Sequence, residues 1–302
     1  MWRISLLTVV PMLNMRYEGE SKGMVSRLRI PIIVGHGANS IAKIRKYLSH
    51  GVHVLEIDVI KDTETHELIL QHVREDDILK EVLRLGSRVH QILETMLTYL
   101  PLVKPRKLSD VLRMLSGRAD VILDLKWKGL TKDLAELLSE VDFKGNVYVT
   151  SRYHKDLLEI KRLIPRVKTL VSFDDQPVMC AEYVSKLKAD GASVRVAFID
   201  KDLVNEMHKH GYILAAWTVN DIALARYLAN LGVDMIITDV PEEIIKGFKK
   251  AIEEEEREEE ERIRIEEMGR KEESIPVLGG IDHMFGLEFY QSIKRRQEEE
   301  RM

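Results

Sequence analysis

The sequence predicts a closed (β/α)8 TIM barrel with three additions: a β-hairpin after the second strand, a helical insertion, and a charged helical C-terminal extension. Several of the apolar runs end in His, Asp, Glu or Lys, and enzymes with this fold carry their chemistry at the carboxyl ends of the strands. Segments of helical periodicity separate the runs, as in a closed parallel barrel. The eight runs lie near residues 30–35, 53–59, 120–126, 147–151, 168–173, 192–198, 213–218 and 235–239.

Length and composition suggest one large domain with appendages. The chain has 302 residues, of which 45% are hydrophobic, enough for a barrel of about 220 to 250 residues plus an extension. We expect the barrel over 29–248, an N-terminal extension over 1–28 and a tail over 249–302. The apolar residues 1–13 are too short to span a bilayer. They resemble a signal peptide but lack its cleavage motif, and a translation start at Met15 or Met24 explains them equally well.

Charge and cysteine content exclude some classes of protein. The net charge is −4 and the pI is about 6.2, so no basic field favours nucleic acid as a partner. The single cysteine, Cys180, excludes an intrachain disulfide. We therefore expect a cytoplasmic protein that binds no nucleic acid.

The segments between the apolar runs read mostly as helices. Residues 156–164 and 204–211 have the 3.6-residue spacing, and Gly211 stands where a C-cap is expected. An insertion over about 73–104 is helical by pattern and predicts a lid or subdomain. Residues 251–270 are dominated by Glu and Arg and hold too few apolar residues for a core. We expect an exposed helix there, which solvent surrounds or which contacts an oligomer or another partner.

A hairpin is predicted after the second strand. The run 67–72 follows after only six residues, too few for a crossover helix, so it must return antiparallel. Folding the chain about residues 63–65 sets His72 opposite Glu56. This register would bring a histidine to the carboxylates of the second strand.

The polar residues at the strand ends predict a metal-assisted acid/base site. Glu56 and Asp58 are two apart on a strand and share a face, as do Asp124 and Lys126. Three carboxylates from two strands suit one hard divalent cation, and Lys126 suits a phosphate oxygen. His36 and His72 can serve as acid and base at neutral pH.

Several spaced motifs, in order across residues 30–245, resemble the glycerophosphodiester phosphodiesterase family. They are Leu55-Glu56-Ile57-Asp58-Val59, a strand ending in His72, the element from Pro105 to Leu112, Trp217-Thr218-Val219-Asn220, and Gly232 to Pro241. The chain departs from that family at His36-Gly37-Ala38, in place of His-Arg-Gly, and at Asp124-x-Lys126, in place of Glu-x-Lys. Those positions are similar to spider-type sphingomyelinase D and phospholipase D, which read Gly-His-x-x-Asn-x-Ile and Asp-x-Lys.

The resemblance implies metal-dependent hydrolysis of glycerophosphodiesters to an alcohol and glycerol phosphate. It assigns His36 and His72 to catalysis, Glu56, Asp58 and Asp124 to Mg²⁺ or Ca²⁺, and Lys126, Trp217 and Asn39 to the substrate. One alternative is a phospholipase D-like enzyme that releases the headgroup of lysophospholipids, forms a cyclic phosphate and contacts membrane surfaces transiently. Another is a non-catalytic barrel that serves as a binding module. Arg152 and Arg195 are either headgroup contacts or ion-paired surface arginines.

Overall fold

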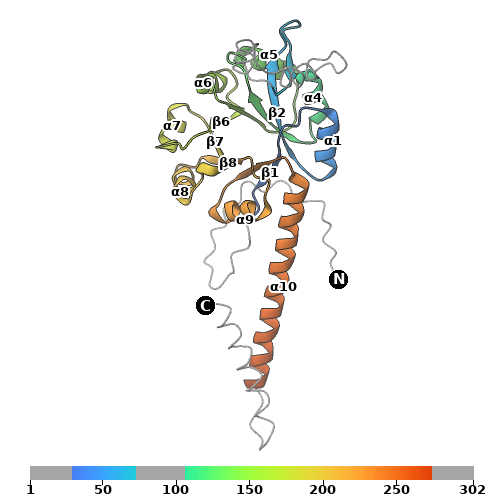
Figure 1. Cartoon of the computed structure of the whole chain (residues 1–302), viewed down its shortest axis with the longest axis vertical. Helices are drawn as coiled ribbons and strands as arrows, with labels where there is room; N and C mark the ends of the chain where they lie inside the picture. Colours follow the sequence, from blue (N-terminus) through green and yellow to red (C-terminus); the bar gives the residue numbers. More distant parts are fainter. Residues whose placement is uncertain (1–28, 73–105, 274–302) are drawn as a thin grey trace, which may run out of the picture. The chain divides into compact units, whose positions relative to one another are not determined.

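The computed structural model describes residues 29–72 and 106–273, and the fold is drawn in Figure 1. The predicted N-terminal extension and helical insertion lie outside the described residues. The strands are β1 (Ile32–Gly35), β2 (Val54–Lys61), β3 (Leu68–Leu70), β4 (Asp120–Leu125), β5 (Val147–Ser151), β6 (Lys168–Phe173), β7 (Gly191–Arg195), β8 (Ile213–Trp217) and β9 (Met235–Thr238). The helices are α1 (Ile41–Ser49), α4 (Leu108–Leu115), α5 (Thr131–Glu140), α6 (His154–Leu163), α7 (Cys180–Lys186), η1 (Val196–Phe198), α8 (Lys201–Lys209), α9 (Ile222–Leu231) and α10 (Pro241–Glu273).

Parallel strands in the described residues close into the predicted barrel. The order is β1-β9-β8-β7-β6-β5-β4-β2, and a further pairing joins β1 to β2. Closure rests on β1, which pairs in parallel with β9 through Val34↔Ile237 and with β2 through Val34↔Val54. The predicted strand over 192–198 ends earlier, at Arg195, because η1 takes its last three residues.

The predicted hairpin is present, but its register differs from the expected one by a residue. β3 pairs antiparallel with β2 through Val59↔Leu70 and Lys61↔Leu68. Continued past the end of β3, this register sets His72 opposite Ile57 and not opposite Glu56. The turn accounts for the difference: Glu67 O accepts from Asp62 N at 2.8 Å, so the hairpin folds about a point half a residue further on.

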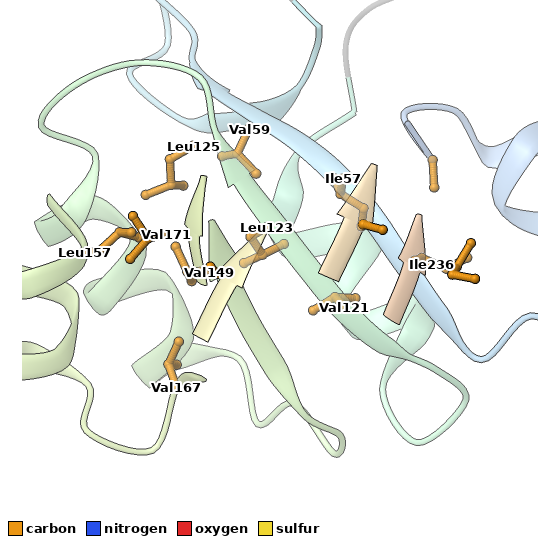
Figure 2. Packing of buried hydrophobic residues seen from close by; sticks show 14 of the residues in the cluster. Ile57, Val59, Val121, Leu123, Leu125, Val149, Leu157, Val167, Val171 and Ile236 are labelled. Atoms are coloured by element: carbon orange, nitrogen blue, oxygen red, sulfur yellow. The ribbon is translucent and has the colours of Figure 1, made fainter. Parts of the chain in front are cut away.

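Side chains alternate between two apolar layers, as the two-residue period of a strand requires. An inner cluster fills the barrel with Val34, Val54, Ile122, Tyr148, Leu170, Ala215, Met235 and Ile237. An outer cluster joins the strands to the surrounding helices. Figure 2 shows part of it, with Val149 and Val171 on the strands and Leu157 on α6. The inner cluster therefore identifies the inward-facing positions of every barrel strand except β7, whose Ala192 and Val194 belong to the outer cluster.

Helix ends follow their local sequence. Ser40, Asp200 and Asp221 cap α1, α8 and α9 by accepting a hydrogen bond from the backbone three residues on. Gly211 follows the end of α8 with a φ of 73°, a left-handed conformation that favours glycine. No helix in the described ranges is both long enough and apolar enough to cross a membrane.

The chain forms two units that divide after Lys249. The second unit begins within α10, and its described side chains, over 250–268, are largely exposed. Ion pairs on that helix join Lys250 to Glu254 and Arg262 to Glu259. An exposed charged helix agrees with the composition of the segment, and its role stays a prediction.

Candidate active site

The inward-facing positions change from apolar to polar at the carboxyl end of the barrel. On β2, Val54 faces the inner cluster, and Glu56 and Asp58 follow on the same face. β4 repeats this arrangement with Ile122, Asp124 and then Lys126. Of these side chains, Glu56, Asp124 and Lys126 line a pocket of about 490 Å³ together with His36 and His72, and Asp58 is buried next to Asp124 in the neighbouring strand. The barrel thus brings together at one mouth residues that lie far apart in the sequence.

Glu56, Asp58 and Asp124 form an acidic cluster. One oxygen from each lies within 4.8 Å of the others. The register explains this geometry, because β2 and β4 pair in parallel with Asp58 directly beside Asp124. Glu56 and Asp58 are buried and Asp124 is half-buried. The donor set is three carboxylates, which suits a hard divalent cation such as Mg²⁺ or Ca²⁺.

The pKa values of the three carboxylates are shifted in different directions. Burial, followed by the charges of Asp58 and Asp124, raises the pKa of Glu56 well above its ordinary value. Burial also acts to raise the pKa of Asp58, but the hydrogen bond with His72 and the charge of Lys126 outweigh it and hold that pKa well below the usual range. Burial raises the pKa of Asp124 against the opposing charge of Lys126. Burial and crowded negative charge therefore shift Glu56 and Asp124 in the opposite direction from Asp58.

Lys126 supplies the positive charge within this cluster. Its Nζ lies 2.6 Å from Asp58 Oδ1 and also pairs with Asp124. Burial lowers the pKa of Lys126, but the charges of Asp124, Asp58 and Glu56 together raise it above its usual value. Lys126 lines the pocket, and its contact with a substrate phosphate stays a prediction.

His72 contacts Asp58, not the predicted partner Glu56. Its Nδ1 lies 2.8 Å from Asp58 Oδ2. His72 stands two residues after the end of β3, where Gln71 N still donates to Asp58 O at 3.1 Å. The register of the hairpin thus continues to Gln71, and the ring of His72, one residue further on, reaches Asp58, which adjoins the expected neighbour Ile57.

His36 has a carboxylate partner that the motifs did not single out. Its Nδ1 lies 2.7 Å from Asp239 Oδ1, directly after β9. Asn220 clamps that aspartate on two sides: its Nδ2 donates to Asp239 Oδ2, and its Oδ1 accepts from Asp239 N, both at 2.9 Å. Burial acts to raise the pKa of Asp239, but the hydrogen bonds with Asn220 and His36 lower it below its ordinary value. Asp239 follows the inward-facing Ile237 by two residues, and that spacing is the sequence signal that identifies it.

The backbone that carries His36 is held tightly. The hydroxyl of Tyr47 donates to His36 O at 3.1 Å. Gly37, at a φ of 59°, makes the turn after β1 and donates its N–H to Glu56 Oε2 at 2.6 Å. These contacts join the first histidine to the acidic cluster.

Comparison with known proteins places this arrangement in a family. Residues 60–243, more than half of the chain, match the model of the glycerophosphoryl diester phosphodiesterase family. The chain belongs to that family. It is 26% identical over 183 residues to a glycerophosphodiester phosphodiesterase of Bacillus altitudinis, covering 56% of this chain and 71% of the relative. It is 22% identical over 232 residues to that of Caldanaerobacter subterraneus subsp. tengcongensis, covering 70% of this chain and 92% of the relative.

A solved structure agrees on the fold. The structure of an Oleispira antarctica phosphodiesterase, in complex with the product sn-glycerol-3-phosphate, has a TM-score of 0.60 to this chain at 21% identity. It covers 73% of this chain and 97% of its own. Membership of the glycerophosphoryl diester phosphodiesterase family makes the chain a phosphoric diester hydrolase. The matched range begins after Asp58, so His36, Glu56 and Asp58 join the site through the geometry of the barrel.

Two predicted substrate residues have different placements. Trp217 lines the pocket, with its indole N–H donating to Ser193 O at 3.1 Å. Asn39 instead binds Asp58 twice: its Nδ2 donates to Asp58 Oδ2 at 2.5 Å, and its Oδ1 accepts from Asp58 N at 2.9 Å. Both ends of the amide bind Asp58 in this way, so Asn39 orients that carboxylate, and its contact with substrate stays a prediction.

Proposed function

We propose that this chain hydrolyses glycerophosphodiesters to an alcohol and glycerol phosphate with the help of a divalent cation. The observation that carries the proposal is a cluster of three carboxylates within 4.8 Å of one another, two of which, Glu56 and Asp124, line one pocket with His36 and His72. Membership of the phosphodiesterase family supports the reaction class. The solved relative with bound sn-glycerol-3-phosphate supports glycerol phosphate as a product.

The two histidines are arranged for proton transfer. A carboxylate only accepts hydrogen bonds, so a ring nitrogen that binds one must carry a proton. Asp239 accepts from His36 and Asp58 accepts from His72, each through Nδ1. Nε2 is then the nitrogen on each ring that exchanges a proton with the substrate. One Nε2 takes the proton of the attacking hydroxyl or water, and the other protonates the leaving oxygen as its bond to phosphorus breaks.

Glu56, Asp58 and Asp124 are the residues that would hold the cation. A divalent ion bound there supplies positive charge that offsets the negative charge of the phosphodiester. Burial is the first cause of the raised pKa values of Glu56 and Asp124, and the charges of neighbouring carboxylates add to it, so a bound cation would stabilise their charged forms. Lys126 pairs with Asp58 and Asp124 and lines the pocket, so its ammonium group would bind a phosphate oxygen there.

Chelation is expected to silence the enzyme. Treatment with EDTA should lower the rate by about 10² to 10³, the equivalent of several kcal/mol of transition-state stabilisation. Adding excess Mg²⁺ or Ca²⁺ should restore the rate, and circular dichroism should show an intact fold throughout. Full activity in chelator, after dialysis against metal-free buffer, would remove the cation from the proposal.

The Asp239 carboxylate is expected to position His36. Asp239→Asn should lower kcat by about 10²-fold with a small change in KM, because an amide can donate to Nδ1 and hold the wrong tautomer. A merely structural role would not change the pH profile of kcat, so a shifted profile is the deciding measurement. Asp221→Asn, at the cap of α9, is the control. An unchanged pH profile in Asp239→Asn would contradict the assignment.

Products distinguish hydrolysis from the phospholipase D-like alternative. We propose following glycerophosphocholine and lysophosphatidylcholine by ³¹P NMR. Glycerol phosphate as the first and final product supports direct attack by water. A cyclic phosphate that accumulates supports the alternative, which the Asp124-x-Lys126 and His36-x-x-Asn39 spacings favour. No turnover of either substrate, with added Mg²⁺ or Ca²⁺, would overturn the proposed function.

A further inference from the structure

The three consecutive strands β5, β6 and β7 carry the same pair of residue types at their carboxyl ends, on the side that faces the pocket. Each presents a hydroxyl residue that borders the cavity, and each presents a charged residue two positions later. A spacing of two keeps both members of a pair on one face of a strand. The pairs are Thr150 on β5 with Arg152 directly after that strand, Ser172 on β6 with Asp174 directly after it, and Ser193 with Arg195 on β7. A hydroxyl layer therefore lies below a charged layer at the rim.

The charged layer carries an excess of positive charge. Arg152 Nη2 lies 3.2 Å from Asp174 Oδ2, and Arg195 Nη1 lies 3.5 Å from Asp174 Oδ1. Two guanidinium groups thus share one carboxylate. Both arginine side chains are about half exposed, at 50% and 55%, so each keeps donors that a ligand can reach.

Arg152 gives the pocket a second charged end. It is the only charged residue among the described lining residues contributed by β5 to β9, whose other members are hydroxyl, aromatic or apolar. The acidic cluster, Lys126 and the two histidines all come from β1 to β4. An elongated substrate anchored at the cluster meets Arg152 when it extends over β5.

The distance along β5 from the acidic cluster to Arg152 can be estimated from the strand register. Thr150 lies beside Asp124 in the register of β4 and β5. Its buried hydroxyl has no hydrogen-bond partner among the described residues, and the residue lines the cavity. Arg152 follows two residues later, roughly 7 Å further along the strand. That separation suits a small alcohol group attached to a phosphorus held at the cluster.

We propose that Arg152 and Arg195 form a subsite for an anionic group on the alcohol portion of the substrate. The group is a carboxylate or a further phosphate, which a guanidinium binds through paired N–H donors. The subsite rests on the proposed function and adds a substrate class to it: glycerophosphodiesters with a negatively charged headgroup. Trp217 and Tyr153 also line the cavity and could hold a quaternary ammonium group by cation–π contact. Glycerophosphocholine is therefore the informative competitor.

Glycerophosphoserine and glycerophosphoethanolamine provide a matched test, because the two differ by one carboxylate. With the wild-type chain and added Mg²⁺, kcat/KM for the serine compound should exceed that for the ethanolamine compound about three- to fivefold, as expected for a half-exposed ion pair. Raising the salt to about 0.5 M should shrink this ratio, since the rim is accessible to screening ions.

Two variants should move the ratio in opposite directions. Arg152→Gln removes the charge inside the pocket and should bring the ratio to about one. Asp174→Asn releases both guanidinium groups from their shared carboxylate and should raise the ratio about twofold. Arg113→Gln is the control: its side chain is 57% exposed and also has an aspartate partner, but it lies on α4. It should leave the ratio unchanged.

A second pair of substrates tests whether the subsite binds a carboxylate or a phosphate. Glycerophosphoglycerol and its phosphorylated derivative form this second pair, which differs by one phosphate. If kcat/KM favours the anionic member in only one of the two pairs, that pair identifies the anion that the subsite binds. Equal rates for both pairs, or a preference for glycerophosphocholine that Arg152→Gln leaves unchanged, would overturn the subsite while the proposed function stands. Absence of turnover with every compound would overturn the proposed function itself.

Discussion

Replacing His36 by alanine is expected to lower kcat by about 10²- to 10⁴-fold, the usual contribution of a positioned acid or base. The ring binds Asp239 through Nδ1 at 2.7 Å and directs Nε2 into the pocket, 4.0 Å from Glu56 Oε2. Alanine removes the only group at this position that can exchange a proton with the substrate. KM should change little, because the cation site and Lys126 remain. Steady-state kinetics with glycerophosphocholine and excess Mg²⁺ measure the effect.

The fold of this variant should be intact, since the His36 side chain is 28% exposed and contributes little to the core. His208→Ala is the matched control. Its Nε2 lies 3.1 Å from Asp234 Oδ2 and its side chain is 33% exposed. Asp234 precedes β9, at the end of the barrel away from the pocket, so this variant should retain activity. A His36→Ala enzyme that turns over like the control would show that His36 is not catalytic.

Much of the fold was predictable because buried strands and helices show characteristic patterns of apolar residues in the sequence. Parallel strands buried on both faces appear as apolar runs, and the polar residues at their ends stand out against that background. Glu56 and Asp58 could be placed on one face of their strand from their spacing alone, and so could Asp124 and Lys126 on theirs. The pairing of β2 with β4 then brings them together, and a right-handed crossover makes that pairing probable in advance.

The details that sequence missed depend on contacts between distant segments. The partner of His36 comes from the end of β9, which reaches it only because the barrel closes through β1 and β9. The partner of His72 depends on a register that one residue of the turn decides. Asn39 lies in a motif that suggests substrate contact, and its two hydrogen bonds to Asp58 depend on how the loop after β1 approaches β2. Such pairings have no periodic signal.

Glu56→Gln should abolish activity and yet stabilise the metal-free protein at neutral pH. The glutamine is close in shape and can still accept the hydrogen bond from Gly37 N, made at 2.6 Å. It cannot supply a charged oxygen to a cation, so kcat should fall by about 10²- to 10³-fold. Thermal unfolding in EDTA should give a higher Tm for the variant, because the wild-type carboxylate is buried beside Asp58 and Asp124.

The raised pKa of Glu56 determines how the stability of the metal-free protein changes with pH. The folded-state pKa of Glu56 lies well above its ordinary value of 4.5, so the folded wild-type protein binds the proton more tightly than the unfolded chain. Its stability therefore falls as the pH rises above about 4.5, until the folded-state pKa is passed. The advantage of the variant should grow over the same range.

A bound cation should reverse this order. Excess Mg²⁺ or Ca²⁺ should raise the Tm of the wild-type protein more than that of Glu56→Gln, because only the wild type retains the full carboxylate set and ligand binding stabilises the folded state. Glu206→Gln is the control for hydrogen bonding, since Glu206 also accepts from a backbone N–H, that of Ala181 at 2.8 Å. It should gain no stability in EDTA. A Glu56→Gln protein less stable than wild type in EDTA at neutral pH would mean that Lys126 compensates the charge of Glu56 in full, and that the cluster is neutralised without a metal.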